Sequence, residues 1–180
     1  MTDMKAEFDI GPNLPLVYLI LGPARSGKDT AGDELARLTG LQKGSTSEEF
    51  FHHKALTRDK FAAMVGDDWR LLLAEWMAQY NRRDGSGCKL YKEMFGRGVR
   101  IFTGIRRLGE LDAFYGWLRD RADARVWWVD AELRNIPEDP SIDFGQFLLK
   151  VSCLPYTTID SNAGVPELLT EVRKAWEEQA

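Results

Sequence analysis

The sequence has few of the residues that cross-link small proteins or bind metals in them. Its 180 residues include two cysteines, Cys88 and Cys153, and two histidines, His52 and His53. The cysteines are too few and too far apart for a disulfide framework or a zinc site, and they are typical of a reducing cytosol. The histidines have no partner at metal-ligand or catalytic-triad spacing, so we interpret them as part of a helix surface.

Long apolar runs and an excess of positive charge are also missing. Residues 1–13 include acidic side chains and lack the apolar core of a signal peptide, and no later segment is long enough to cross a membrane. We therefore expect a cytoplasmic protein without a membrane partner. The net charge of −4 gives no basic field for a nucleic acid polymer. A single nucleotide is a better-matched partner than a duplex.

Alternating apolar segments indicate the fold class. The 44% hydrophobic content is enough for one substantial core, and no linker or repeat divides the chain. Helical spacing predicts helices at about 48–65 and 67–80, with Trp69, Trp76 and Tyr80 facing the core, and residues 81–98 read as a mobile loop with a short helix in its later part. Strands alternating with helices predict an α/β fold with a mostly parallel sheet covered on both faces. The predicted strands are 15–21, 99–104, 125–130 and 156–160.

The stretch GPARSGKDT (22–30) lies between the first predicted strand and a helix. In such a unit the loop N–H groups and the helix N-terminus favour a bound phosphate. Gly22 and Gly27 allow backbone angles and a close approach that a side chain forbids, and Lys28 would reach the outer phosphates of a nucleoside triphosphate. The motif therefore predicts a phosphate-binding loop made by Gly22, Ala24, Arg25, Ser26, Gly27, Lys28, Asp29 and Thr30.

Two adjacent arginines, Arg106 and Arg107, follow the strand predicted at 99–104. Ligands of parallel sheets sit beyond the carboxyl ends of the strands, which places these arginines near the loop. A guanidinium can hold two phosphate oxygens at once, and phosphoryl transfer needs several cations around the transferred group. We predict catalytic roles for Lys28, Arg106 and Arg107. The alternative for the arginine pair is a solvated helix surface.

The Gly-Lys-Asp-Thr form of the loop resembles the nucleoside monophosphate kinases. It is most similar to the deoxynucleoside monophosphate kinases of bacteriophages and to the animal-type phosphomevalonate kinases. The order of loop, arginine pair and final strand, turn and helix (TTIDSNAGVPELLTEV) is also similar and spans nearly the whole chain. The resemblance implies one P-loop kinase domain over 1–180, with a three-layer P-loop NTPase fold and a mostly parallel five-stranded sheet. It also implies ATP and Mg²⁺ as cofactors and small-molecule nucleotide substrates.

The resemblance also implies further site residues. Asn162, Ala163 and Gly164 would line the adenine pocket, and Arg134 would belong to a short lid within about 131–150. Residues 45–98 match no family pattern and would form an acceptor-binding insertion or flap, because they combine aromatics suited to a base with cations suited to a phosphate. The predicted acceptor residues are Trp69, Arg70, Arg82, Arg83 and Arg97, with a solvated loop as the alternative for the last three.

One position departs from the family pattern. The related kinases have a strand ending in Asp-x-Arg, and this chain has Gly104 where that aspartate is expected. A carboxylate there would organise magnesium, so the role is either lost or moved to Asp29, Asp130 or Asp160. Each of these also has an ordinary explanation as a helix-dipole or turn residue. We predict that Thr30 and Asp130 take part in metal binding.

The function predicted from the sequence is ATP-dependent phosphoryl transfer to a (deoxy)nucleoside monophosphate, giving the diphosphate. Two alternatives stay open. One is a kinase of a non-nucleotide phosphate such as phosphomevalonate, and the other is a nucleotide-binding module that has lost catalysis, for which Gly104 is the main argument. The oligomeric state also stays open, a homodimer included. If the protein is phage-encoded, the cytoplasm would be that of the host.

Overall fold

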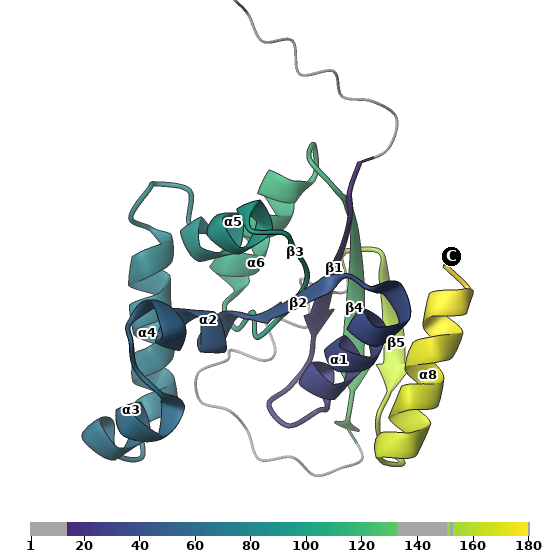
Figure 1. Ribbon diagram of the computed structural model, residues 1–180, viewed down its shortest axis with the longest axis horizontal. Helices are drawn as coiled ribbons and strands as arrows, with labels where there is room; N and C mark the ends of the chain where they lie inside the picture. Colours follow the sequence, from purple (N-terminus) through teal and green to yellow (C-terminus); the bar gives the residue numbers. More distant parts are fainter. Residues whose placement is uncertain (1–13, 133–150, 152, 180) are drawn as a thin grey trace, which may run out of the picture.

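A five-stranded parallel sheet forms the centre of the protein (Figure 1). The computed structural model describes residues 14–132, 151 and 153–179. The strand order is β2-β3-β1-β4-β5, and every neighbouring pair is parallel. The α/β fold with a mostly parallel five-stranded sheet is therefore confirmed. The strands are β1 (Leu16–Leu21), β2 (Gln42–Ser45), β3 (Val99–Thr103), β4 (Asp123–Asp130) and β5 (Tyr156–Asp160).

Helices cover both faces of the sheet and make it the middle of three layers (Figure 1). Helices α1 and α8 pack on one face, and α5 and α6 pack on the other. Helices α2, α3 and α4 lie beside the β2 edge and are called the α2–α4 lobe below (Figure 1). The helices are α1 (Lys28–Thr39), α2 (Thr46–His53), α3 (Arg58–Val65), α4 (Trp69–Asn81), α5 (Lys89–Gly96), α6 (Leu108–Leu118) and α8 (Val165–Glu177).

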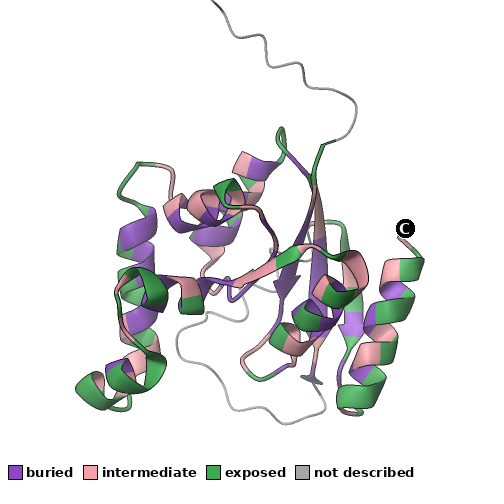
Figure 2. Cartoon of the chain, in the orientation of Figure 1, coloured by how far each residue is buried: buried purple, intermediate pink, exposed green. Residues whose placement is uncertain are grey.

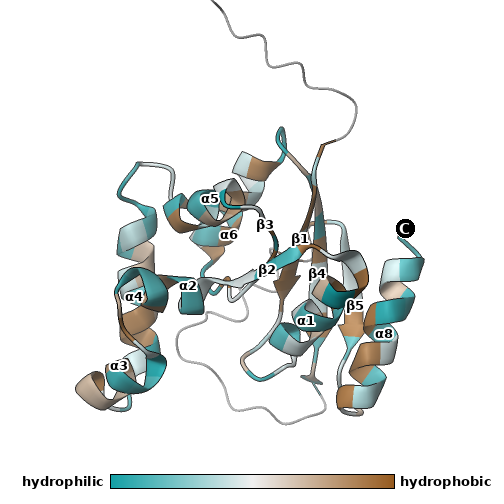
Figure 3. Ribbon diagram, in the orientation of Figure 1, coloured by the Kyte–Doolittle hydropathy of each residue, from teal (hydrophilic) through white to brown (hydrophobic). Residues whose placement is uncertain are grey.

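The central strand β1 is buried on both faces, as Figures 2 and 3 show by its burial and apolar character. Val17 and Leu19 pack in the core beneath α5 and α6, whereas Tyr18 and Ile20 pack in the core beneath α1 and α8. A parallel strand covered on both sides needs apolar side chains at successive positions, which is the pattern of LVYLIL. None of the helices that the structure describes combines the length and apolar character needed to span a bilayer.

The strand register brings the carboxyl ends of the strands to one edge of the sheet. Thr103, the last residue of β3, lies opposite Ile20 of β1 and Ser45 of β2. On the other side, Asp130 at the end of β4 lies opposite Asp160 at the end of β5. The loop that follows β1, the residues after β3 and the start of α2 therefore share this edge.

Three local features differ from the sequence-based expectation. Strand β2 was not predicted, because its sequence QKGS is polar. The helix expected at about 48–65 is two helices, α2 and α3. Between them Ala55 takes a left-handed φ of 52°, and the Thr57 side chain caps α3 by accepting from the backbone N–H of Lys60 at 3.3 Å. Trp76 was expected in the core and is 38% exposed. Local turn chemistry and an edge position outweighed the apolar pattern at these places.

Helix α5 confirms the short helix expected in the later part of 81–98. Its inner side is buried, as is the residue that precedes it; the buried residues are Cys88, Leu90, Tyr91 and Met94. One side of the helical part of this segment is therefore packed into the core, and the exposed residues are 82–85 and 96–97.

Glu34 of α1 joins the two helices on one face of the sheet. Although it is only 6% exposed, it accepts two hydrogen bonds from Arg37 at 2.8 Å and one from Arg173 of α8 at 2.7 Å. These bonds, chiefly those from Arg37, lower the pKa of Glu34 to about 2 from an ordinary value of 4.5. The ionised carboxylate is thus the form that stabilises the α1–α8 contact.

We expect Glu34→Gln to lower the free energy of unfolding at pH 7 and to have a smaller effect in acid. Because the folded pKa lies below the unfolded value of 4.5, the stabilisation is present above that pH and is lost as the pH falls toward 2. Urea unfolding at pH 7 and pH 4 measures the difference between wild type and variant. Glu177→Gln, at an exposed position of α8, is the control. An equal difference at both pH values would contradict this role of the ionised carboxylate.

Candidate functional site

The loop between β1 and α1 has a backbone that requires both of its glycines. A Cβ atom on Gly22, whose φ is 150°, would lie 2.7 Å from the carbonyl oxygen of Val129. A Cβ atom on Gly27, whose φ is 97°, would lie 2.8 Å from a methyl carbon of Leu168. Arg25 is also left-handed, with a φ of 62°. Left-handed residues in a tight loop allow successive backbone N–H groups to converge on an anion.

The loop is held in place by short hydrogen bonds. The backbone oxygen of Ser26 accepts from the hydroxyl of Ser161, just beyond β5, at 2.6 Å, and both residues are buried. The ammonium group of Lys28 lies back across the loop and donates to the carbonyl oxygen of Pro23 at 3.0 Å. The ammonium group of Lys28 thus lies over the loop that is predicted to bind phosphate.

A cavity of about 350 Å³ opens between this loop and the start of α8. Gly164 is the member of the predicted adenine segment that lines it. Asn162 belongs to the same turn and donates to the Asp160 carboxylate from its backbone at 2.8 Å and its side chain at 2.7 Å. The lining residues are Arg25, Gly27, Lys28, Asp29, Thr30, Gly164, Val165 and Leu168.

The arginine pair lies where the sequence predicted, directly after β3 at the carboxyl edge of the sheet. The guanidinium of Arg107 forms an ion pair of 2.7 Å with Glu75 of α4. That contact bridges the sheet edge and the α2–α4 lobe, and it lowers the pKa of Glu75 through the hydrogen bond from Arg107. Arg106 precedes it in a half-buried position.

A buried polar network lies behind the arginines and was not predicted. Glu110, in the first turn of α6, is 5% exposed and accepts from Asn81 at 3.0 Å and from the hydroxyl of Tyr91 at 2.9 Å. Asn81 also accepts from the backbone N–H of Leu90 at 2.9 Å. Burial raises the pKa of Glu110, against the opposing effect of these bonds and of the nearby arginines. The network fixes the ends of α4, α5 and α6 relative to one another.

Gly104 is a glycine for steric reasons. Its φ is 86°, and an added Cβ would lie 2.8 Å from the Thr46 hydroxyl. That hydroxyl is buried and donates to the carbonyl oxygen of Gly104 at 2.8 Å, which ties the start of α2 to the end of β3. The aspartate expected at this position has no room in this arrangement.

A carboxylate from the loop meets the end of β3 instead. The hydroxyl of Thr103, which is fully buried, donates to Oδ1 of Asp29 at 2.6 Å. By contrast, Asp130 accepts from the backbone N–H of Glu132 at 3.1 Å, the local contact of a turn residue. The described part of the chain holds no group of three or more histidine, cysteine or carboxylate residues that could bind a metal by themselves.

The five predicted acceptor residues do not come together in one place. Trp69 and Arg70 begin α4, whereas Arg82 follows its end, and a helix of this length separates the two by about 18 Å. Arg97 forms an ion pair of 2.5 Å with Glu49 of α2. The predicted lid residue Arg134 lies outside the described residues. The five acceptor residues are Trp69, Arg70, Arg82, Arg83 and Arg97.

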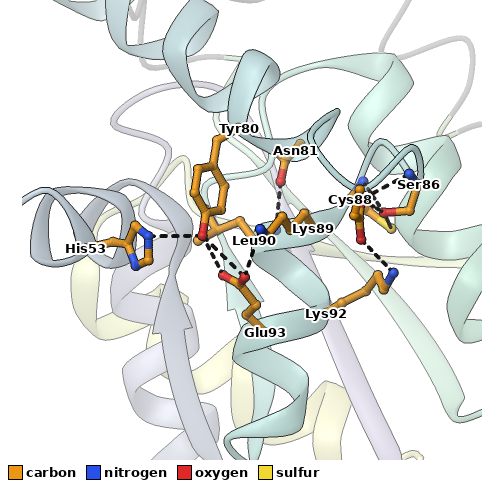
Figure 4. A network of polar contacts seen from close by, with 10 residues as sticks. His53, Tyr80, Asn81, Ser86, Cys88, Lys89, Leu90, Lys92 and Glu93 are labelled. Carbon is orange, nitrogen blue, oxygen red and sulfur yellow. Dashed lines mark hydrogen bonds and ion pairs between the residues drawn. The ribbon is translucent and has the colours of Figure 1, made fainter.

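Tyr80 cross-links the helices next to the sheet edge (Figure 4). Its hydroxyl donates to the Glu93 carboxylate at 2.9 Å and contacts Nε2 of His53 at 3.0 Å. The cations of Arg83 and Lys89 lie 5.3 and 5.1 Å from the centre of its ring. His53, interpreted from the sequence as helix surface, is exposed and joins α2 to α4 through this contact.

Comparison with known proteins bears on the fold. No protein-family model matches the chain, and no curated protein matches its sequence. Solved structures of shikimate kinases are similar in fold, from Aquifex aeolicus (18% identity, TM-score 0.55) and from Bacteroides thetaiotaomicron (14%, 0.53). Each comparison covers 91% of this chain and 98% of the other. This chain therefore shares its fold with these kinases. A shikimate kinase from Acinetobacter baumannii in complex with shikimate is similar too, at 19% identity and a TM-score of 0.53, covering 91% of this chain and 92% of that one.

Proposed function

We propose that this protein transfers the γ-phosphoryl group of ATP to a (deoxy)nucleoside monophosphate, giving the diphosphate. The observation that carries the proposal is the loop between β1 and α1, in which Lys28 lies across a glycine-dependent backbone beside a cavity of about 350 Å³. A cavity of that size suits a small-molecule ligand. The P-loop kinase fold is consistent with it.

The loop and the arginines supply the charge that this reaction needs. ATP with Mg²⁺ provides the transferred group and part of its neutralisation. The loop N–H groups and Lys28 would hold the phosphates, and Arg106 and Arg107 would face the transferred group from the end of β3. No protein nucleophile is needed, because an oxygen of the acceptor phosphate attacks in line. Fixed cations that meet the developing charge are the main catalytic device of such a site.

The acceptor would bind between the sheet edge and the α2–α4 lobe. Arg107 pairs there with Glu75, whose side chain is 48% exposed, so an incoming phosphate can replace that carboxylate at small cost. Helical spacing places Arg82 on the same side of α4 as Glu75. The assignment of a nucleoside monophosphate also rests on the resemblance of the loop and the arginine pair to the nucleoside monophosphate kinases. In this arrangement one face of α4 would contact the phosphate of the acceptor.

A kinase of a non-nucleotide acceptor is the second candidate. The structures similar in fold with TM-scores above 0.5 include shikimate kinases, and shikimate carries no base. The aromatic side chains of the lobe are also largely engaged with one another, as in the contact between Phe61 and Trp76 at 5.3 Å. A compact acceptor without an aromatic base would not need them as stacking partners.

A panel of deoxynucleoside and ribonucleoside monophosphates, assayed with ATP and Mg²⁺, tests the proposal. We expect at least one to raise ATP consumption about tenfold or more above hydrolysis alone, because the acceptor completes the reacting geometry. Shikimate and mevalonate phosphate are included for comparison. Turnover of only a non-nucleotide acceptor would favour the second candidate. ATP binding without any turnover would leave a nucleotide-binding module, and no ATP binding would overturn the phosphate-loop assignment.

A further inference from the structure

Asp29 and Thr103 form a pair that joins the loop to the neighbouring strand. Asp29 follows Lys28 in the first turn of α1, and Thr103 is the last residue of β3. The hydroxyl of Thr103 donates to the carboxylate of Asp29 at 2.6 Å, and this hydrogen bond joins the start of α1 to the end of β3. Thr103 is fully buried, whereas Asp29 is exposed and lines the cavity beside Lys28.

This pair has the chemistry of a standard phosphate loop with its two partners exchanged. In the standard motif a serine or threonine directly follows the lysine and binds magnesium, and an aspartate from a neighbouring strand completes the site. Here the carboxylate follows the lysine, on Asp29, and the hydroxyl comes from the strand, on Thr103. The hydroxyl–carboxylate contact is therefore retained while the residue types have changed places.

Gly104 leaves this position at the end of β3 without a carboxylate. A carboxylate at the end of β3 is excluded by the left-handed backbone and by the Thr46 hydroxyl, 2.8 Å from an added Cβ. A carboxylate on the loop avoids that clash and remains next to Lys28, where the outer phosphates would bind. With Gly104 at the end of β3, Asp29 brings a carboxylate to this edge of the sheet beside Lys28.

We propose that Asp29 is the carboxylate ligand of the magnesium ion that accompanies ATP, and that Thr103 positions it. The proposal rests on the proposed function. Thr103 donates a hydrogen bond to Oδ1, and a carboxylate can still bind a cation through its other oxygen. Lys43 donates to the backbone oxygen of Asp29 at 3.1 Å, which further fixes this turn.

One carboxylate is enough for such a site, and the other predicted positions fit less well. Mg²⁺ in phosphoryl-transfer sites is held by one or two carboxylates, with phosphates and water supplying the other ligands. Asp130 accepts from Glu132 in its own turn and lies on β4, across β1 from β3. Thr30 lines the same cavity as Asp29 but has no carboxylate. Neither shares the contact with the end of β3 that Asp29 has.

Binding of a non-hydrolysable ATP analogue, measured by calorimetry with Mg²⁺ and with EDTA, tests the proposal without any turnover. For the wild type we expect Mg²⁺ to tighten binding. In Asp29→Asn that enhancement should fall by about tenfold or more. Binding of the metal-free analogue should stay equal or become tighter, because the variant removes a negative charge next to the phosphates. A purely structural role would weaken binding under both conditions.

Three further variants sharpen the test. Thr103→Val removes the donated hydrogen bond and should reduce the Mg²⁺ enhancement, whereas Thr103→Ser keeps the hydroxyl and should restore it. Asp33→Asn is the matched control on α1, since Asp33 pairs with Lys43 at 2.6 Å and carries the same charge one turn away. It should leave the enhancement unchanged. Electron paramagnetic resonance of Mn²⁺ in the analogue complex should show loss of bound ion in Asp29→Asn alone among the aspartate variants.

The outcomes separate this proposal from the proposed function. An undiminished Mg²⁺ enhancement in Asp29→Asn, or an equal loss in Asp33→Asn, would overturn the role of Asp29 and leave ATP binding intact. Equal weakening with and without Mg²⁺ would also overturn it and make Asp29 a structural residue. A wild-type protein that does not bind the analogue at all would overturn the proposed function itself.

Discussion

Lys28→Met is expected to lower kcat for phosphoryl transfer by about a hundredfold or more, because a charge aimed at the transferred group matters most in the transition state. The fold should stay intact. The ammonium group of Lys28 contacts the carbonyl oxygen of Pro23 in its own loop, and Lys28 is not among the described residues that make up the two cores. Circular dichroism and thermal unfolding of the purified variant measure the second expectation, and a coupled kinase assay with the acceptor found in the panel measures the first.

A matched control separates this specific effect from a general loss of charge. Lys60→Met removes the same charge at an exposed position of α3, in the α2–α4 lobe, and should keep wild-type kcat. Turnover by Lys28→Met at the wild-type rate would show that the loop does not bind phosphate in this protein. An unfolded variant would show instead that the contact with Pro23 is structural, and Lys28→Arg, which retains the charge, would then decide between the two explanations.

Gly104→Ala is expected to destabilise the protein by about 2 to 4 kcal/mol. Two costs combine: a left-handed backbone costs about 1 to 2 kcal/mol for a residue with a side chain, and displacing the buried Thr46 hydroxyl breaks a hydrogen bond worth about 1 to 2 kcal/mol. An added Cβ would lie 2.8 Å from that hydroxyl, which has no exposed surface to move into. Urea unfolding at pH 7 measures the loss. Gly104→Asp, which introduces the residue expected from the resemblance, should be at least as unstable.

Gly40→Ala isolates the backbone part of this cost. Gly40 ends α1 with a φ of 71°, and an added Cβ there meets no atom within 4 Å. Its substitution should therefore cost about 1 kcal/mol. If Gly104→Ala costs no more than Gly40→Ala, the Thr46 contact is not what excludes a side chain, and the explanation of the missing aspartate fails with it.

The parts of the fold that the sequence predicted well are those whose pattern is set locally. Strand β1 is buried on both faces, so its apolar run was visible in LVYLIL. The loop was visible because its backbone has no room for a Cβ at Gly22 and Gly27, which requires glycine at both positions. Strand β2 was missed because it lies at the edge of the sheet, where polar residues such as Gln42 and Lys43 are tolerated. The break near Ala55 was missed because it depends on one left-handed residue.

The site was predicted less completely than the fold because its remaining contacts join distant positions. The hydrogen bond between Thr103 and Asp29, and the one from Thr46 to Gly104, connect residues that no local pattern relates. The predicted acceptor cations failed to converge for a related reason. Charge content marked Arg70 and Arg82 as candidates, but the length of α4 separates them, and only the folded chain shows that Arg107 faces Glu75.

The central place of β1 in the sheet has a consequence for how the chain is made. β1 leaves the ribosome first among the strands, yet its partners, such as Ile101 in β3 and Asp123 in β4, follow much later. At ordinary rates of synthesis the apolar strand waits unpaired on both edges for several seconds or more. A sheet with such distant pairings also folds slowly. The candidate site should therefore form late in translation, once β4 has docked on β1 and α8 has covered it.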